Sequence, residues 1–198
     1  MKYFIVGLHA SGKNEAIDIL RDNGVKCGNL FTNLESPNEK VYNYNRYDYY
    51  PRQDINIVFE NDAYLFIQEL NPHQYSDEPY YEGISKYTFD ENDVFVISPD
   101  QLIGINQNSI KEPVCFVWMD STKSQRISRY KEERRQYNFM ERDEIEKRDI
   151  DSFVKTLYSF KNSEVMYFYN EQPQRVATII ETVIKHPDTL ESFIKNFN

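Results

Sequence analysis

The chain has 198 residues, of which 40% are hydrophobic and 28% are charged, and its formal net charge is −9. This length and composition fit one globular domain with a core of its own, and the negative charge argues against a protein that binds a nucleic-acid polymer over its whole surface. No apolar run approaches the ~20 residues of a membrane span, and Cys27 and Cys115 stand outside any metal-ligand or CxxC pattern, which predicts free thiols in a cytoplasmic protein without a membrane partner.

The first elements of the chain predict a strand, a glycine loop and a helix. Residues 2–6 (KYFIV) form a short apolar run rich in β-forming side chains, which is typical of a buried strand. A glycine follows this run, and residues 13–21 then carry three apolar side chains at helical spacing. The chain therefore begins as the first half of an α/β unit.

The middle of the chain, about residues 30–87, has a different composition. It holds ten of the 16 tyrosines, together with many Asn, Asp and Pro residues. We interpret it as an insertion into an α/β core formed by residues 1–29 and 88–198, within a single domain that spans residues 1–198. Insertions of this kind often carry substrate specificity, because they vary on a rigid scaffold.

Strand and helix patterns alternate again after the insertion. Apolar runs predict buried strands at residues 94–98, 114–119 and 165–169, and longer periodic patterns predict helices at residues 123–137, 143–160 and 174–184. Such alternation predicts a parallel sheet covered by helices on both faces. The expected fold is therefore α/β, a three-layer arrangement of the P-loop NTP hydrolase type with a central parallel sheet.

The segment 123–149 differs in charge from the rest of the chain. It holds nine Lys and Arg residues against seven Asp and Glu residues, whereas the remainder has a net charge of −11. A basic segment on an acidic protein indicates a local anion site. A solvated helical face with i,i+4 ion pairs, such as Glu144 with Arg148, would give a similar pattern.

The strongest signal is a phosphate-binding loop between the first predicted strand and helix. Residues 7–13 match the GxxxxGK pattern, in which the glycines let consecutive N–H groups converge on phosphate oxygens and the lysine reaches the β- and γ-phosphates. Asn14 stands where the pattern has Ser or Thr, and its amide oxygen is a candidate Mg²⁺ ligand. The loop residues expected to bind ATP are Gly7, His9, Ala10, Ser11, Gly12, Lys13 and Asn14.

With this loop in place, the remaining motifs resemble those of guanylate kinases. Residues 79–86 (PYYEGISK) resemble the family's double tyrosine before a glycine, and residues 66–69 (FIQE) resemble the segment whose glutamate holds the guanine edge. Residues 94–101 (VFVISPDQ) resemble a strand that ends in a functional Asp, and residues 167–171 (YFYNE) resemble the strand that closes beside adenine. The nearest candidates for the family's Thr-Thr-Arg-x-x-Arg signature are Thr32, Arg46 and Arg52.

The resemblance implies a guanylate-kinase-like fold with a core, an inserted monophosphate-binding region and a helical lid at about residues 123–149. Catalysis in such kinases is mostly positioning and charge stabilisation, so the resemblance implies that Lys13 acts together with arginines of the lid. The lid arginines expected to contact phosphate are Arg135, Arg142 and Arg148. The residues expected to bind the acceptor are Arg46, Glu69, Tyr81 and Asp100, and the residue expected beside adenine is Asn170.

The predicted function is phosphoryl transfer from ATP, with Mg²⁺, to a nucleoside or deoxynucleoside monophosphate. The prediction includes no nucleic-acid polymer as partner and is compatible with a homodimer, and a phage-type deoxynucleotide kinase for an unusual base is one version of it. Two alternatives stay open. Asn14 favours a guanylate-kinase-like binding module without catalysis, which the intact pair Gly12 and Lys13 opposes, and the second alternative is a P-loop kinase of another small acceptor.

Overall fold

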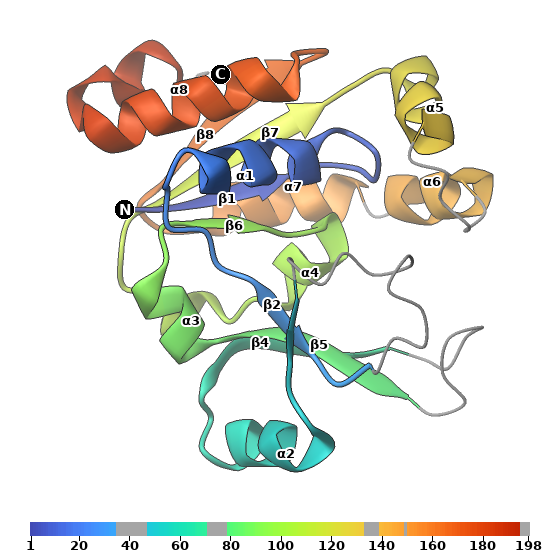
Figure 1. Cartoon of the computed structure of the whole chain (residues 1–198), viewed down its shortest axis with the longest axis vertical. Coiled ribbons are helices and arrows are strands. Elements are labelled where there is room, and N and C mark those ends of the chain that lie inside the picture. Colours follow the sequence, from blue (N-terminus) through green and yellow to red (C-terminus); the bar gives the residue numbers. More distant parts are fainter. Residues whose placement is uncertain (35–46, 71–78, 133–138, 149, 195–198) are drawn as a thin grey trace. The chain divides into compact units, whose positions relative to one another are not determined.

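The computed structural model of the chain describes five stretches, namely residues 1–34, 47–70, 79–132, 139–148 and 150–194. The chain divides into two compact units. The first unit comprises Met1–Cys27, Asp93–Ile103 and Glu112–Asn198, and the second comprises Gly28–Asn92 and Gly104–Lys111. Figure 1 shows the helices and strands of both units.

The first unit is built around a parallel sheet of four strands, in the order β6-β1-β7-β8. The strands are β1 (Lys2–Val6), β6 (Val94–Val96), β7 (Val114–Asp120) and β8 (Ser163–Tyr169). All four overlap the predicted apolar runs, because a strand that is covered on both faces needs apolar side chains on both. β1 pairs with β6 on one side and with β7 on the other, so its carboxyl end lies in the middle of the sheet's carboxyl edge.

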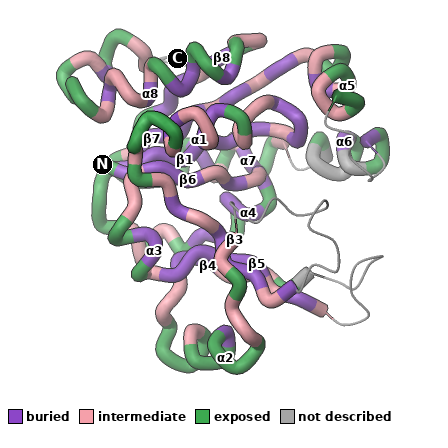
Figure 2. Tube along the Cα trace, in the orientation of Figure 1, coloured by how far each residue is buried: buried purple, intermediate pink, exposed green. Residues whose placement is uncertain are grey.

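Helices α1 (Lys13–Asp22) and α8 (Pro173–Lys185) cover one face of this sheet (Figure 1). Their apolar stripes pack against strand residues from alternate positions, because consecutive strand side chains point to opposite faces. The buried residues of this layer include Tyr3, Ile5, Ile17, Leu20, Val117, Met166 and Ile180. Figure 2 shows that the central strands are buried along most of their length.

The opposite face of the sheet carries aromatic side chains, against which α7 (Ile150–Ser159) packs. Ring contacts join Phe4 to Phe116, Phe116 to Phe160, and Trp118 to Phe153 of α7. The sheet therefore has a helical layer on each side, and the predicted three-layer α/β fold with a central parallel sheet is confirmed.

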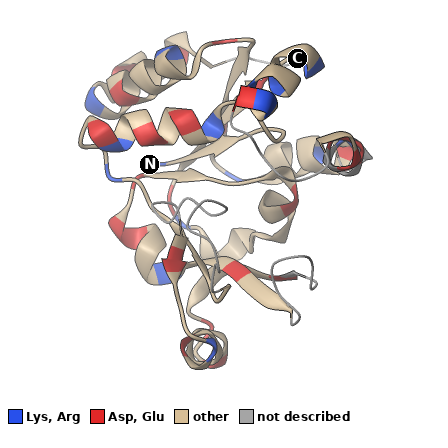
Figure 3. Cartoon of the chain, turned by 45° about the vertical axis from the view of Figure 1, so that its right-hand side comes forward, with Lys and Arg blue, Asp and Glu red and all other residues tan. Residues whose placement is uncertain are grey.

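Further helices follow the carboxyl ends of the strands. α4 (Pro99–Gly104) follows β6, and α5 (Lys123–Glu132) follows β7. The range 143–160, predicted as one helix, holds parts of two, α6 (Phe139–Arg148) and α7, and a 3-10 helix (Pro187–Ser192) follows α8. Figure 3 shows Lys, Arg, Asp and Glu on the helices, whereas the central strands carry few of them. Within the described residues, no helix combines the length and the apolar character that crossing a membrane would need.

Both cysteines are free thiols, as the sequence predicts. Cys115 is buried in β7, and Cys27 is half-buried at the end of the segment that precedes the second unit. Burial raises the pKa of Cys27 to about 11 and that of Cys115 to about 12, because it disfavours the thiolate. Neither group is therefore activated as a nucleophile.

The second unit contains a mixed sheet of four strands, in the order β3-β2-β5-β4. The strands are β2 (Leu30–Thr32), β3 (Tyr47–Tyr49), β4 (Tyr64–Leu70) and β5 (Tyr80–Ser85). β2 and β3 are parallel, and β5 pairs antiparallel with both β2 and β4. The helices of this unit are α2 (Arg52–Glu60), α3 (Lys86–Glu91) and the 3-10 helix Gln107–Ser109.

The sequence patterns predict none of these four strands. β2 and β3 have three residues each, which is too short to show a period of two. Their place in a sheet is instead decided by packing around β5. A Cβ atom on Gly83 would lie 2.5 Å from the carbonyl oxygen of Phe66 and 2.6 Å from Cζ of Phe31, so β5 needs a glycine where its neighbours approach.

Candidate active site

The predicted phosphate loop lies in the first unit, between the end of β1 and the start of α1. Its backbone has positive φ angles of 151° at Gly7, 55° at Ala10 and 99° at Gly12. A Cβ atom on Gly7 would lie 2.2 Å from the carbonyl oxygen of Met119, and one on Gly12 would lie 2.7 Å from Cγ of Pro173. Both glycines of the motif are therefore required by conformation and by close packing.

The loop leads directly into the N-terminus of α1, where the backbone N–H groups suit an anion. Gly12 is the N-cap residue of α1, and no side chain caps the helix there. The first N–H groups of a helix lack acceptors within the helix, and the helix dipole places partial positive charge beside them. Phosphate groups bind at such helix ends.

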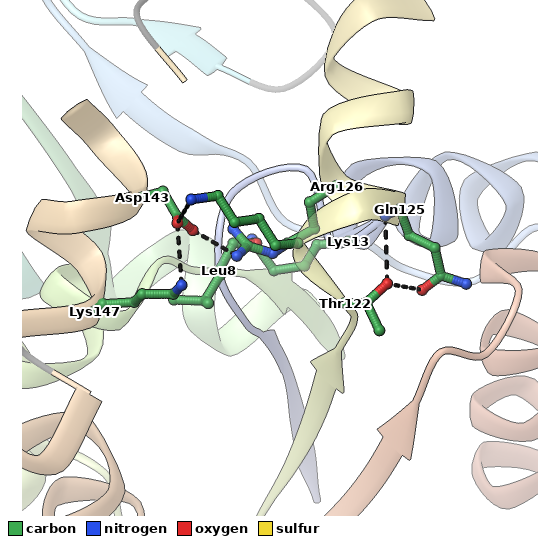
Figure 4. Close-up of polar contacts among 8 residues, drawn as sticks. Leu8, Lys13, Thr122, Gln125, Arg126, Asp143 and Lys147 are labelled. Atoms are coloured by element: carbon green, nitrogen blue, oxygen red, sulfur yellow. Dashed lines mark hydrogen bonds and ion pairs between the residues drawn. The ribbon is translucent and has the colours of Figure 1, made fainter. Parts of the chain in front are cut away.

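Lys13 holds its ammonium group across this loop. Its Nζ donates hydrogen bonds to the carbonyl oxygens of Gly7, at 2.6 Å, and Leu8, at 2.8 Å. Figure 4 shows the contact with Leu8. A positive charge is thus fixed beside the loop backbone, which is where the motif requires it to reach a phosphate chain.

The remaining loop residues are held by contacts with the segment that follows β7. The carbonyl oxygen of Ser11 accepts a hydrogen bond from Nη1 of Arg129, at 2.8 Å, although the two residues are 118 positions apart. His9 is buried, and its ring centroid lies 4.5 Å from that of Phe139, the first residue of α6. The side chain of His9 therefore packs from the loop against α6. The motif does not predict this role, because it allows any residue at this position. Asn14 lies half-buried in the first turn of α1.

Asp120 is a candidate site residue that the sequence reasoning missed. It ends β7, which is the neighbour of β1, so it lies at the same sheet edge as the loop. Its carboxylate accepts a hydrogen bond of 2.7 Å from the hydroxyl of Tyr167, and burial together with this bond raises the pKa of Tyr167. In P-loop enzymes an Asp that follows an apolar strand holds Mg²⁺, and the run VCFVWMD carries that signal. Oxygen atoms of Asp120 and Asn14 fit a hard cation.

Asn170, expected beside adenine, has a role in the backbone of this edge. Its N–H donates to the carbonyl oxygen of Asp120, at 2.9 Å, and its side-chain Oδ1 accepts from the N–H of Thr122, at 2.8 Å. Its φ of 55° is one that Asn tolerates better than most residues. These bonds connect the end of β8 to the start of α5, and the contact with adenine stays a prediction.

The expected lid arginines are only partly described. Arg135 lies outside the described residues, and Arg142 and Arg148 belong to α6 with their side chains outside the description. Two other arginines, Arg126 and Arg129, belong to α5, and the sequence reasoning did not select them. Arg129 contacts the loop directly.

The expected acceptor residues are divided between the two units. Glu69 and Tyr81 are register partners on β4 and β5 of the second unit, and the Tyr81 hydroxyl donates to Oε2 of Glu69 at 3.1 Å. This hydrogen bond raises the pKa of Tyr81. Asp100 is exposed in the first turn of α4 in the first unit, and Arg46 lies outside the described residues.

Glu82, the neighbour of Tyr81, points to the opposite face of the second sheet and is buried, with 5% of its surface exposed. Its register partners are Thr32 on β2 and Gln68 on β4. The two faces of this sheet therefore differ: one presents the exposed Glu69 and the half-buried Tyr81, and the other carries a row of three polar residues across adjacent strands.

No protein-family model and no curated protein sequence matches the chain. Among solved structures, a guanylate kinase from Anaplasma phagocytophilum is similar at 10% sequence identity, with 94% of this chain and 85% of that chain covered and a TM-score of 0.45. A sugar kinase from Janibacter sp. HTCC2649 is similar at 11% identity, with 93% of this chain and 95% of that chain covered and a TM-score of 0.43. At these TM-scores neither likeness decides a function, so function is inferred from the chain's own residues.

Proposed function

We propose that the protein transfers a phosphoryl group from ATP to a small acceptor. The observation that carries this proposal is the loop from Gly7 to Lys13, whose glycines have the required conformations and whose lysine ammonium lies on the loop backbone. The loop joins a central parallel strand to an uncapped helix N-terminus, which is the context in which such loops hold phosphate chains.

The chemistry of phosphoryl transfer matches the charges at this edge of the sheet. The transition state spreads negative charge over the oxygens of the transferred group, so a protein accelerates it mainly by positioning and by placing positive charge there. Lys13 supplies one such charge, and Arg129 fixes the loop at Ser11. Mg²⁺, when bound, would neutralise phosphate oxygens, and Asn14 and Asp120 are the residues that would hold it.

We propose a nucleoside or deoxynucleoside monophosphate as the acceptor, bound by residues of the second unit. Tyr81 offers a phenol hydroxyl to a phosphate oxygen, and the Glu69 carboxylate suits a base edge that donates hydrogen bonds, as guanine does through N1–H and its 2-amino group. Both polar groups lie on the same face of the second sheet, where they hydrogen-bond to each other. Arg46, outside the described residues, and Asp100, in the first unit, stay predictions from the sequence.

The test is a transfer assay with γ-labelled ATP and Mg²⁺ against a panel of nucleoside monophosphates, deoxynucleoside monophosphates and sugars. We expect label to appear on a monophosphate and on no sugar. Label on a sugar would contradict a monophosphate acceptor and favour the alternative of a P-loop kinase that acts on another small acceptor. Binding of ATP without transfer to any acceptor would instead favour the catalytically degenerate module that Asn14 suggests.

A further inference from the structure

The first turns of α5 carry two arginines on one helical face. Arg126 and Arg129 are three residues apart, and residues at this spacing are neighbours on a helix surface. Arg129 reaches the phosphate loop, where it donates to Ser11. The face of α5 that carries Arg126 is therefore the face turned toward the loop.

Arg126 is almost completely buried and only partly satisfied. Its side chain is 2% exposed, and its Nη2 donates to Oδ1 of Asp143 at 2.5 Å. Within the described part of the chain, its Nε and Nη1 are buried with no hydrogen-bond partner. A guanidinium carries five N–H donors and is always charged, and burying such donors unpaired is unfavourable. An oxyanion would supply acceptors for these two nitrogens.

Asp143 of α6 organises the positive charges around Arg126. It is 1% exposed, and its Oδ2 lies 3.2 Å from Nζ of Lys147 and 3.6 Å from Nζ of Lys123. Burial alone would raise the pKa of Asp143, but the hydrogen bonds from Arg126 and Lys147 hold it below its usual value. One carboxylate thus faces three cations, as Figure 4 shows in part, and the cluster is left with an excess of positive charge.

The cluster is tied to the loop by Phe139. The Arg126 guanidinium carbon lies 5.6 Å from the centroid of the Phe139 ring, and the His9 ring lies 4.5 Å from the same ring. Phe139 is itself buried. One aromatic ring therefore joins the guanidinium of α5 to the backbone segment that is expected to hold phosphate.

We propose that Arg126 binds an oxyanion of the polyphosphate chain held by the loop, and that Asp143 is a positioning residue that orients its guanidinium group. Asp143 accepts from Nη2, and the N–H donors on Nε and Nη1 are left for an oxyanion. The identity of the oxyanion rests on the proposed function. The rival explanation is a buried ion pair that only joins α5 to α6.

The experiment measures the dissociation constant of inorganic tripolyphosphate by calorimetry, which needs no turnover. Arg126→Ala should weaken binding at least tenfold, equivalent to about 1.4 kcal/mol. Arg126→Lys should also weaken it, because lysine lacks the separate donors on Nε and Nη1. The matched control is Arg175→Ala, which removes an exposed arginine of α8 that pairs with Glu171. The control should bind tripolyphosphate as the parent does.

The role of Asp143 is tested by chemical rescue. Methylguanidinium at millimolar concentration should restore part of the tripolyphosphate affinity of Arg126→Ala, and it should fail to do so in the double variant Arg126→Ala with Asp143→Asn. All variants are compared at a temperature well below their unfolding midpoints, so a loss of stability is not scored as a loss of binding. Equal rescue with and without the carboxylate would overturn the positioning role.

The outcomes separate this inference from the proposed function. If the parent binds tripolyphosphate and both Arg126 variants bind it equally well, Arg126 is a structural residue and only this inference fails. If the parent binds neither tripolyphosphate nor ATP, both fail. If the parent binds both ligands with the expected variant effects but transfers phosphate to no acceptor, the oxyanion site stands and the kinase activity does not.

Discussion

In the first unit, the proposed phosphate-binding residues are consecutive in the chain, and their geometry is enforced by neighbours such as Met119 and Pro173. In the second unit, Glu69 and Tyr81 are 12 positions apart and meet because β4 and β5 pair in one register. Most of the loop is buried and tightly packed, whereas Glu69 is exposed and Tyr81 is half-buried at a sheet surface. The difference indicates that the proposed phosphate-binding loop is constrained by backbone conformation, while the proposed acceptor pair is open to change by single substitutions.

The largest expected effect is that of Lys13→Ala, which should change the rate of phosphoryl transfer but not the binding of the acceptor. Lys13→Ala removes the charge that follows the transferred group and should lower the transfer rate by about 100- to 1000-fold. Binding of the acceptor, measured by calorimetry without ATP, should stay within about twofold of the parent. The matched control is Lys26→Ala, which removes an exposed lysine of the same unit. Transfer at the parent rate in Lys13→Ala would contradict the kinase proposal.

The second comparison is between a glycine of the loop, Gly7, and a glycine of the second sheet, Gly83, each replaced by alanine. Gly7→Ala and Gly83→Ala each place a Cβ atom within 2.5 Å of a backbone carbonyl oxygen, so each should lower the free energy of unfolding by about 1–3 kcal/mol. Only Gly7→Ala should abolish tripolyphosphate binding. Gly104→Ala, where no atom lies within 4 Å of the new Cβ, is the control for stability in denaturant titrations. Loss of tripolyphosphate binding in Gly83→Ala would break the comparison.

If Asp120 holds Mg²⁺, a substitution at Asp120 in the first unit should change how phosphoryl transfer depends on Mg²⁺ concentration. Asp120→Asn removes a charged oxygen ligand and should raise the Mg²⁺ concentration for half-maximal transfer by about 10- to 100-fold. Asp188→Asn, at an exposed position, should leave this concentration unchanged. The measurement is a Mg²⁺ titration of transfer at saturating ATP, and an unshifted curve for Asp120→Asn would place the metal elsewhere.

Substitutions in the second region should change acceptor choice rather than donor binding. Glu69→Gln should weaken guanine-nucleotide binding about tenfold and relax base choice, because a neutral amide loses a charge-assisted hydrogen bond. Tyr81→Phe should weaken all monophosphates alike, by about threefold to tenfold. Tyr64→Phe is the control, since Tyr64 contacts Phe59 as Tyr81 does. Parent-like binding in both variants would move the acceptor to another surface, such as the face that carries Glu82.

The smallest expected effect concerns Asn14. Asn14→Ser restores the hydroxyl that the loop motif usually has, and an amide oxygen and a hydroxyl are both ligands for Mg²⁺. The variant should therefore keep or raise the Mg²⁺-dependent transfer rate, by no more than about threefold. A fall of tenfold or more would mean that the asparagine amide has a role that a hydroxyl does not supply.

The sequence by itself determines the strand, loop and helix of residues 2–22, because a buried strand, two glycines and an apolar stripe are all local patterns. It also determines the parallel sheet, since each of its strands lies in a recognisable apolar run, even β6, which is shorter than its run. It does not determine β2 and β3, because segments of three residues have no period and depend on their partners.

Only the tertiary structure decides which charged residues gather at the loop. Arg129 meets Ser11 across 118 positions, and Arg126 meets Asp143 across 17. In the sequence the two arginines belong to one basic segment, in which every arginine is chemically equivalent to the others. Burial distinguishes them, because a guanidinium removed from water needs a carboxylate or an anion within hydrogen-bond distance, and only the packing of α5 and α6 around Phe139 brings such partners together.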